Sequence, residues 1–279
     1  MNDRRSDQAA RRAYWAKSME AAADFMHRLA ECPVNECGEE LVPLPEAAAR
    51  AGVEMTFSER PHFAGGPRLF YLRAGLTDAL MTVGRQLNDR GWALHVEDAY
   101  RTVAMQRDGW LNAGLFGAIL EQVKWELDGR APDAALLHRR MEALLALSPR
   151  VGAHMSGSAV DVSVYRLQDG TEVDRGGPYP TMSEVTPMDS PWVGAEARAH
   201  RDAIRGGFER CGFLAYPWEF WHFNQGDIYE QILRGDARRA RYGPVHFDPA
   251  TGRIEPVEHP EEPLVPVEEI DRMIRAALA

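Results

Sequence analysis

The sequence predicts an α+β fold in which a small, mostly antiparallel sheet is flanked by helices. Segments with apolar residues at helical spacing occur at both ends of the chain, whereas segments that alternate like strands are few and short. With 279 residues, the chain is long enough to bury a core without a disulfide framework. An apolar fraction of 45% and a charged fraction of 27% are ordinary for a globular protein.

The first third of the chain alternates between helical and extended patterns. Residues 8–30 are alanine-rich and periodic, and residues 43–52 have the proline start and glycine stop of a short helix. Residues 57–72 mix turn signals with apolar side chains, so we expect them to wrap around the surface. A helix is predicted over 76–91, and residues 92–101 alternate as a strand does.

The middle of the chain contains the most distinctive strand. Residues 102–126 and 132–147 are predicted to be helical. Small residues at the start of 151–167 give way to the alternation AVDVSVY, which predicts a loop that leads into a strand. A hairpin turn at 168–170 then leads into a glycine- and proline-rich loop over 174–195.

The last third is predicted to hold three helices and one aromatic strand. Residues 196–212 form a helix with a glycine stop, and 213–225 are aromatic and extended. A short helix follows at 227–235. A proline-rich, acidic segment then leads to an amphipathic helix over 267–279.

Charge and composition limit the classes of partner. The formal net charge of −10 argues against a general nucleic-acid or anionic-membrane surface. No window approaches about 18 uninterrupted apolar residues, and the charged N-terminus lacks the features of a signal peptide. We therefore expect a cytoplasmic protein. Cys32 and Cys37 lack a second ligand pair at zinc-finger spacing, so ordinary free thiols are expected. The sequence does not indicate an oligomeric state.

The first candidate site residues are His154 and Asp161, which flank a run of small residues. Small residues permit a tight turn, which would bring the histidine and the aspartate together. A lone histidine more often packs or caps than binds a metal, but Asp161 interrupts an apolar strand. Since a buried carboxylate is costly unless it is paired or bound to a cation, this pair predicts a ligand role.

The second candidate pair is Glu219 and His222, in the run of aromatic residues that begins at Tyr216. On a regular strand, side chains three residues apart point to opposite faces. Both can reach one metal only if a bend lies between them, or if Glu219 lies at the entry of the strand just after Pro217.

Together, these residues predict a hydrolytic metal centre. Two imidazoles and one carboxylate, from His154, His222 and Asp161, leave a fourth tetrahedral position for water, as in catalytic zinc sites. Glu219 would be the general base for that water. Arg101, in the run EDAYR, would stabilise the developing oxyanion. Two histidines and one carboxylate also suit iron or cobalt.

These motifs resemble those of the D-alanyl-D-alanine dipeptidase and carboxypeptidase family of zinc peptidases (peptidase family M15). The family pattern S-x-H-x-x-G-x-A-x-D corresponds to 152–161, E-x-W-H to 219–222, and the Y-R pair to Tyr100 and Arg101. The resemblance covers roughly 95–225 and implies the same roles: three zinc ligands, a glutamate base and an arginine at the transition state. It implies a zinc site in a cleft on the sheet.

Two departures from the family pattern bear on the substrate. Gly152 replaces the serine that opens the first motif, and Pro180 replaces the aspartate that receives the substrate's free amine in the dipeptidases. Glu184 or Asp189 could substitute from the same loop. The candidate substrate-binding residues are therefore Glu184, Asp189, Tyr100 and Trp221.

Three parts of the chain are expected: an N-terminal helical extension over 1–45, a zinc peptidase domain over 46–240, and a proline-rich acidic tail with a helix over 241–279. The favoured function is zinc-dependent hydrolysis of D-Ala-D-Ala or a related cell-wall dipeptide. The alternatives are a D,D-carboxypeptidase or amidase of altered specificity, a non-catalytic metal-binding protein, and an interaction module. A small peptide is the expected partner, with no nucleic acid and no membrane.

Overall fold

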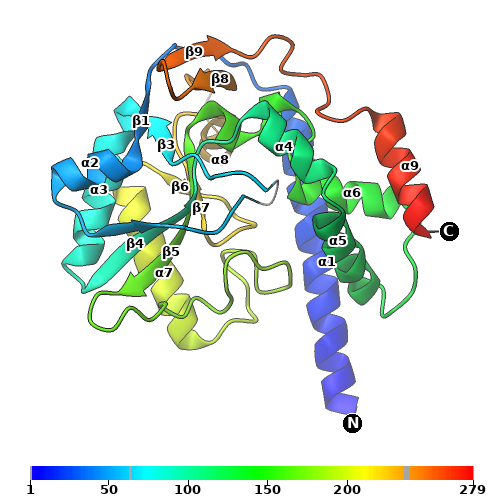
Figure 1. The fold of residues 1–279 in the computed structure, drawn as a ribbon. Helices are drawn as coiled ribbons and strands as arrows, with labels where there is room; N and C mark the ends of the chain where they lie inside the picture. The colour runs from blue at the N-terminus through cyan, green and yellow to red at the C-terminus, as the bar shows by residue number, and fades with distance from the viewer. Residues whose placement is uncertain (1, 63–64, 236–238, 279) are drawn as a thin grey trace.

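A five-stranded sheet lies at the centre of the protein, between two groups of helices (Figure 1). The structure is a computed structural model that describes residues 2–62, 65–235 and 239–278. The strand order is β2-β4-β5-β7-β6; β2 is parallel to β4, and every other pair is antiparallel. The predicted α+β fold with a mostly antiparallel sheet is confirmed. The strands are β2 Met55–Phe57, β4 Trp92–Asp98, β5 Ala159–Arg166, β6 Leu214–Ala215 and β7 His222–Asn224.

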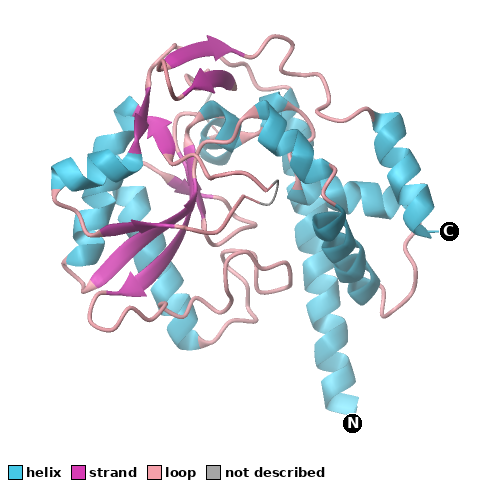
Figure 2. Ribbon diagram, viewed as in Figure 1, coloured by secondary structure: helices cyan, strands magenta, loops and turns pink. Residues whose placement is uncertain are grey.

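One group of helices packs close to the sheet. It comprises α2 Leu44–Ala51, α3 Ala74–Asn88 and α7 Ala195–Arg210 (Figure 2). Buried aliphatic side chains of α2 and α3 and aromatic side chains of α7 and β7 meet the valines of β5 in the main core. Burial of these apolar surfaces holds the sheet rigid behind the site.

The second group lies on the other side of the sheet and has cores of its own. The long α1 Asn2–Ala30 packs against α6 Ala134–Leu144, and the C-terminal helix α9 Val267–Leu278 packs against α6 as well. The remaining helices are α4 Val103–Trp110, α5 Ala113–Glu126 and α8 Ile228–Arg234. Among the described residues, no helix is both long and apolar enough to cross a bilayer.

The structure differs from the sequence prediction at one helix. The single helical pattern over 102–126 is two helices, α4 and α5, because the side chain of Asn112 accepts a hydrogen bond from the backbone N–H of Leu115 and caps α5. Such a cap starts a new helix, since it satisfies a backbone donor that has no partner within the helix.

Five short strands were not predicted, and β2 is one of them. Strand β1 Leu41–Pro43 pairs with β3 Tyr71–Arg73, and β8 Val245–Asp248 forms a hairpin with β9 Arg253–Pro256. The hairpin lies within the segment 241–279 that we expected to be a tail, and Val245 is fully buried against Tyr100. This segment therefore covers part of the central domain; the proposed three-part division of the chain stays a prediction.

The entry into β5 depends on Gly157. A short 3-10 turn, Ala153–Ser156, ends at this glycine, which has a φ of +67°. A Cβ at this position would lie 2.3 Å from Cδ2 of Leu41, a buried side chain. Both the positive φ and the close approach of Leu41 thus require glycine here.

Gly157→Ala should lower the free energy of unfolding by more than the about 1–2 kcal/mol that the left-handed conformation costs alone, because Leu41 must also move. Gly91→Ala is a matched control, since Gly91 has a φ of +76° and a Cβ added there would meet no atom within 4 Å. Urea denaturation measures both. Equal losses for the two variants would show that the contact with Leu41 contributes nothing.

Candidate metal centre

The three predicted metal ligands come from three different elements and meet at the sheet. His154 lies in the 3-10 turn, Asp161 lies on β5, and His222 is the first residue of β7. The antiparallel register of β5 and β7 pairs Asp161 directly with His222. All three side chains are buried, and their candidate donor atoms lie within 4.8 Å of one another.

The spacing of these donor atoms fits a metal ion. Oδ1 of Asp161 lies 3.3 Å from Nε2 of His154 and 3.0 Å from Nδ1 of His222. Four ligands at about 2.0–2.1 Å from a tetrahedral zinc ion are separated by about 3.3 Å. The residues present therefore fit a first coordination shell with little rearrangement.

The orientation of His154 is fixed by its other ring nitrogen. Its Nδ1–H donates to the carbonyl oxygen of Ala99, at 2.6 Å. This hydrogen bond sets the tautomer, so that the lone pair of Nε2 faces Asp161. Metal-binding histidines are commonly held in this way by a backbone carbonyl.

Asp161 is held in the charged form. Burial alone would raise the pKa of its carboxyl group, but His154 and His222 keep that pKa well below its ordinary value. The other oxygen, Oδ2, accepts hydrogen bonds from Arg101 Nη2 at 3.2 Å and from the hydroxyl of Tyr179 at 3.1 Å. One oxygen thus faces the histidines, while the second is held by the protein.

Glu219 lies in a tight turn and not on a regular strand, so its side chain and that of His222 need not point to opposite faces although they are three residues apart. The N–H of His222 donates to the carbonyl of Glu219, and the N–H of Glu219 donates to the carbonyl of Tyr216. Because β7 begins only at His222, Glu219 precedes the strand and can line the same cavity. Burial raises the pKa of Glu219 to about 7, and the nearby negative charge of Asp161 contributes to the same shift to a smaller extent.

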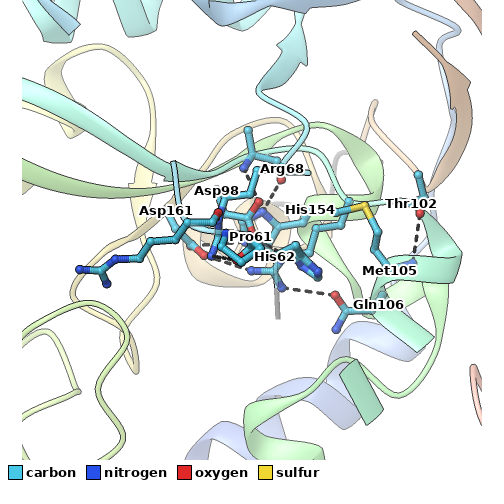
Figure 3. Close-up of polar contacts among 12 residues, drawn as sticks. Pro61, His62, Arg68, Asp98, Thr102, Met105, Gln106, His154 and Asp161 are labelled. Atoms are coloured by element: carbon cyan, nitrogen blue, oxygen red, sulfur yellow. Dashed lines mark hydrogen bonds and ion pairs between the residues drawn. The ribbon is translucent and has the colours of Figure 1, made fainter. Parts of the chain in front are cut away.

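Arg101 connects Asp161 of the candidate metal centre to a second buried carboxylate, that of Asp98. Figure 3 labels Asp98, Asp161 and Gln106, the three residues to which Arg101 donates. Its Nε donates to Oδ2 of Asp98 at 2.8 Å, and its Nη1 donates to Oε1 of Gln106 at 3.3 Å. Asp98 is fully buried at the end of β4, where the register places it beside Asp161. Burial lowers the pKa of the neighbouring His62 to about 3, so that this imidazole is neutral.

A cavity of about 200 Å³ opens above these groups. It is smaller than the roughly 300–1,000 Å³ typical of pockets for drug-sized ligands, so it suits a short peptide segment. Its charged and polar lining residues are Arg68, Arg101, Gln106, Glu219 and the candidate ligands His154, Asp161 and His222. The remaining lining is mainly apolar or aromatic and includes Met26, Ala143–Ala146, Tyr179, Pro180, Tyr216, Trp221 and Tyr229.

Of the four candidate substrate-binding residues, the structure brings only Trp221 to this cavity. Tyr100 is buried, and its hydroxyl donates to the carbonyl of Val245 beneath the C-terminal hairpin. Glu184 forms an ion pair with Arg11 at 2.8 Å.

Asp189 is also occupied elsewhere: it forms an ion pair with Arg205 at 2.8 Å and is largely exposed. Neither Glu184 nor Asp189 lines the cavity. Sequence reasoning missed Arg68, Asp98, Gln106 and Tyr179. Only Asp98 gave a signal, as a carboxylate at the end of the strand that carries the EDAYR run. Cys32 and Cys37 are free thiols, as expected.

Metal-free protein should bind one divalent ion per chain, measured by calorimetric titration with Zn²⁺ and Co²⁺. Asp161→Asn or His222→Ala should weaken binding by more than the about 10–100-fold that loss of a supporting hydrogen bond causes, because each removes a direct ligand. His246→Ala, at an exposed position on β8, serves as the control. Unchanged affinity in Asp161→Asn would contradict the assigned centre.

Parts of this chain are similar in sequence to known peptidases. The family model of peptidase M15, described as D-ala-D-ala dipeptidase, matches residues 130–235. A D-alanyl-D-alanine dipeptidase of Synechocystis sp. is 25% identical over 217 residues, which cover 70% of this chain and 85% of that protein. The enzyme of the same name from Enterococcus faecium is 32% identical over 71 residues, which cover 25% of this chain and 35% of that protein.

Among solved structures, the LdcB LD-carboxypeptidase aligns with a TM-score of 0.36 and 19% identity over 72% of this chain and 75% of that one. His154, Asp161 and the 219–222 motif lie inside the segment that matches the family model, whereas Arg101 precedes it. The resemblance predicted from the motifs is thereby confirmed: this chain is similar to the D-alanyl-D-alanine dipeptidases of the peptidase M15 family.

Proposed function

We propose that this protein is a zinc-dependent peptidase that hydrolyses short peptides, in the first place D-Ala-D-Ala or a related cell-wall dipeptide. The observation that carries the proposal is the buried carboxyl group of Glu219, which lines the same small cavity as His154, Asp161 and His222. A purely structural metal site has no need of a further carboxylate beside its ligands. The similarity to D-alanyl-D-alanine dipeptidases supports the choice of substrate.

The residues divide the chemical work between them. When bound, Zn²⁺ would act as a Lewis acid and lower the pKa of a bound water to about 7. Glu219 accepts a proton from the attacking water and later delivers it to the leaving amine. Arg101, held in place by Asp98, presents its guanidinium to the oxygen that becomes negative in the transition state.

The apolar walls complete the site. Trp221 and Tyr179 meet edge to face at a centroid distance of 5.4 Å and exclude water from one side of the reacting bond. Met26 of α1 and the segment Ala143–Ala146 add further apolar surface to the lining of the cavity. Exclusion of water lowers the local dielectric and strengthens the interaction of Arg101 with developing charge.

Glu219→Gln should lower kcat by about 10²–10⁴-fold, the usual contribution of a general base, while zinc remains bound at one ion per chain. Release of D-alanine from D-Ala-D-Ala measures the rate, and Glu121→Gln, at a side chain 72% exposed on α5, is the control. In the wild type, kcat/KM should rise with pH as Glu219 loses its proton. The midpoint should lie at or below the value of about 7 set by burial, since a bound cation lowers it.

Hydrolysis that is unaffected in Glu219→Gln would remove the catalytic assignment and favour a metal-binding protein without peptidase activity. Loss of zinc from this variant would instead show that Glu219 is a ligand. The limb due to Glu219 should be absent from the pH profile of Glu219→Gln, because the amide does not titrate in this range, and any limb that remains would report the ionisation of the bound water.

A second candidate function, a D,D-carboxypeptidase or amidase, is favoured by Pro180. This residue lines the cavity but offers no charge for a substrate ammonium. Comparison of D-Ala-D-Ala with N-acetyl-D-Ala-D-Ala separates the two functions. A dipeptidase should lose most of its kcat/KM on the acetylated substrate. Equal or faster turnover of the acetylated substrate would favour the second function.

A further inference from the structure

The hydroxyl group of Tyr179 is one of two donors to the outer oxygen of the candidate metal ligand Asp161. It donates to Oδ2 at 3.1 Å, and Nη2 of Arg101 donates to the same oxygen at 3.2 Å. The other oxygen, Oδ1, lies 3.3 Å from Nε2 of His154 and 3.0 Å from Nδ1 of His222. One oxygen of the carboxylate therefore faces the histidines, and the other faces two protein donors.

Two donors are enough to occupy Oδ2. A carboxylate oxygen has about two positions at which it accepts a hydrogen bond, and Tyr179 and Arg101 each take one of them. A metal ion could bind this oxygen only if one of the two donors moved away. Asp161 would thus present Oδ1 alone to a metal ion held by the histidines.

The two donors on Oδ2 differ in charge and in their other partners. The guanidinium of Arg101 is a cation that also donates to Asp98 and Gln106, and the proposed function assigns it to the substrate. The phenol of Tyr179 is uncharged near neutral pH, since the pKa of a tyrosine is ordinarily about 10. A neutral donor holds the carboxylate without repelling a cation bound to the other oxygen.

The segment that carries Tyr179 is itself fixed. The ring of Tyr179 packs edge to face on Trp221, and its backbone carbonyl accepts a hydrogen bond from Nη1 of Arg60 at 3.4 Å. The side chain of Arg201 on α7, which is 2% exposed, donates to four carbonyl groups on either side of Tyr179. These carbonyls belong to Arg175, Val185, Pro187 and Met188. The hydroxyl is therefore held at a defined position, as a group that orients a ligand must be.

We propose that Tyr179 is a positioning residue that keeps the carboxylate of Asp161 in an orientation in which only Oδ1 can bind the metal ion. The inference rests on the proposed function, since it concerns the metal centre of the same site. With one atom from Asp161 and one from each histidine, three protein ligands leave a fourth position for water. A carboxylate that bound through both oxygens would occupy part of the space that this water needs.

The test compares zinc binding by the wild type, Tyr179→Phe and Tyr242→Phe, by calorimetric titration of the metal-free full chain. Tyr179→Phe keeps the ring and removes the hydroxyl, so zinc should bind about 10–100-fold more weakly, the usual effect of losing a supporting residue. Tyr242→Phe is the matched control. Tyr242 is 1% exposed, its hydroxyl donates to a carboxylate oxygen of Glu39 at 2.9 Å, and neither residue lines the cavity. This variant should bind zinc as the wild type does.

A second readout reports the coordination of the metal. Without the hydroxyl of Tyr179, Oδ2 of Asp161 can approach the metal ion, and the coordination number can rise. The visible absorption bands of Co²⁺ weaken as its coordination number rises, so Co²⁺-loaded Tyr179→Phe should absorb less strongly than the wild type. An unchanged zinc affinity together with an unchanged Co²⁺ spectrum in Tyr179→Phe would overturn the inference. Equal losses of zinc affinity in Tyr179→Phe and Tyr242→Phe would also overturn it.

A crystal structure of the zinc-loaded wild type covers the case in which Tyr179→Phe does not fold. Only Oδ1 of Asp161 should lie within the about 2.0–2.2 Å of a zinc–carboxylate bond, and binding of zinc through both oxygens would overturn the inference. None of these measurements needs a peptide substrate. If they give the expected results and the protein hydrolyses no peptide, only the proposed peptidase activity is rejected.

Discussion

The site depends on one buried charge, the carboxylate of Asp161 in the middle of an apolar sheet. An unpaired carboxylate in that position would be strongly destabilising, since burial disfavours the ionised form. The protein offsets this cost from three directions, with His154, His222 and Arg101 around the two oxygens. The same arrangement that stabilises the charge creates a set of donors with the spacing of metal ligands.

The rigidity of the site follows from the register of the sheet. Asp161 is paired with Asp98 on one side and with His222 on the other, so the backbone hydrogen bonds of β4, β5 and β7 set the distances between these side chains. A shift of one residue would turn Asp161 into the opposite core. The main hydrophobic core on the far face of the sheet therefore contributes directly to the chemistry.

Much of this could be predicted from the sequence, because polar residues within apolar strands stand out locally. Asp161 and His222 interrupt strand-like runs, and the glycine and small residues before β5 indicate the turn that carries His154. The strands β1, β2, β3, β8 and β9 are only three or four residues long, too short for alternation to be recognised. The pairs β1–β3 and β2–β4 also join segments that are separated by at least one helix, so local patterns contain no information about these pairings.

The surroundings of the site were harder to predict because they depend on contacts between distant segments. Glu184 lies in the expected loop, but the N-terminal helix brings Arg11 to it, and no local pattern indicates that contact. Arg68 reaches the cavity through a bridge to the strand end that carries Arg101. Tyr100 is adjacent to Arg101 in sequence, yet its hydroxyl reaches Val245 of the C-terminal hairpin.

The most direct test of the account is X-ray absorption spectroscopy of the zinc-loaded protein, which measures the atoms bound to the metal and their distances. The expected result is one zinc ion per chain with four nitrogen or oxygen ligands at about 2.0–2.1 Å, two of which are imidazoles. Sulfur ligands at about 2.3 Å would place the metal at the cysteines instead. That result would contradict the assignment of His154, Asp161 and His222 as the metal centre.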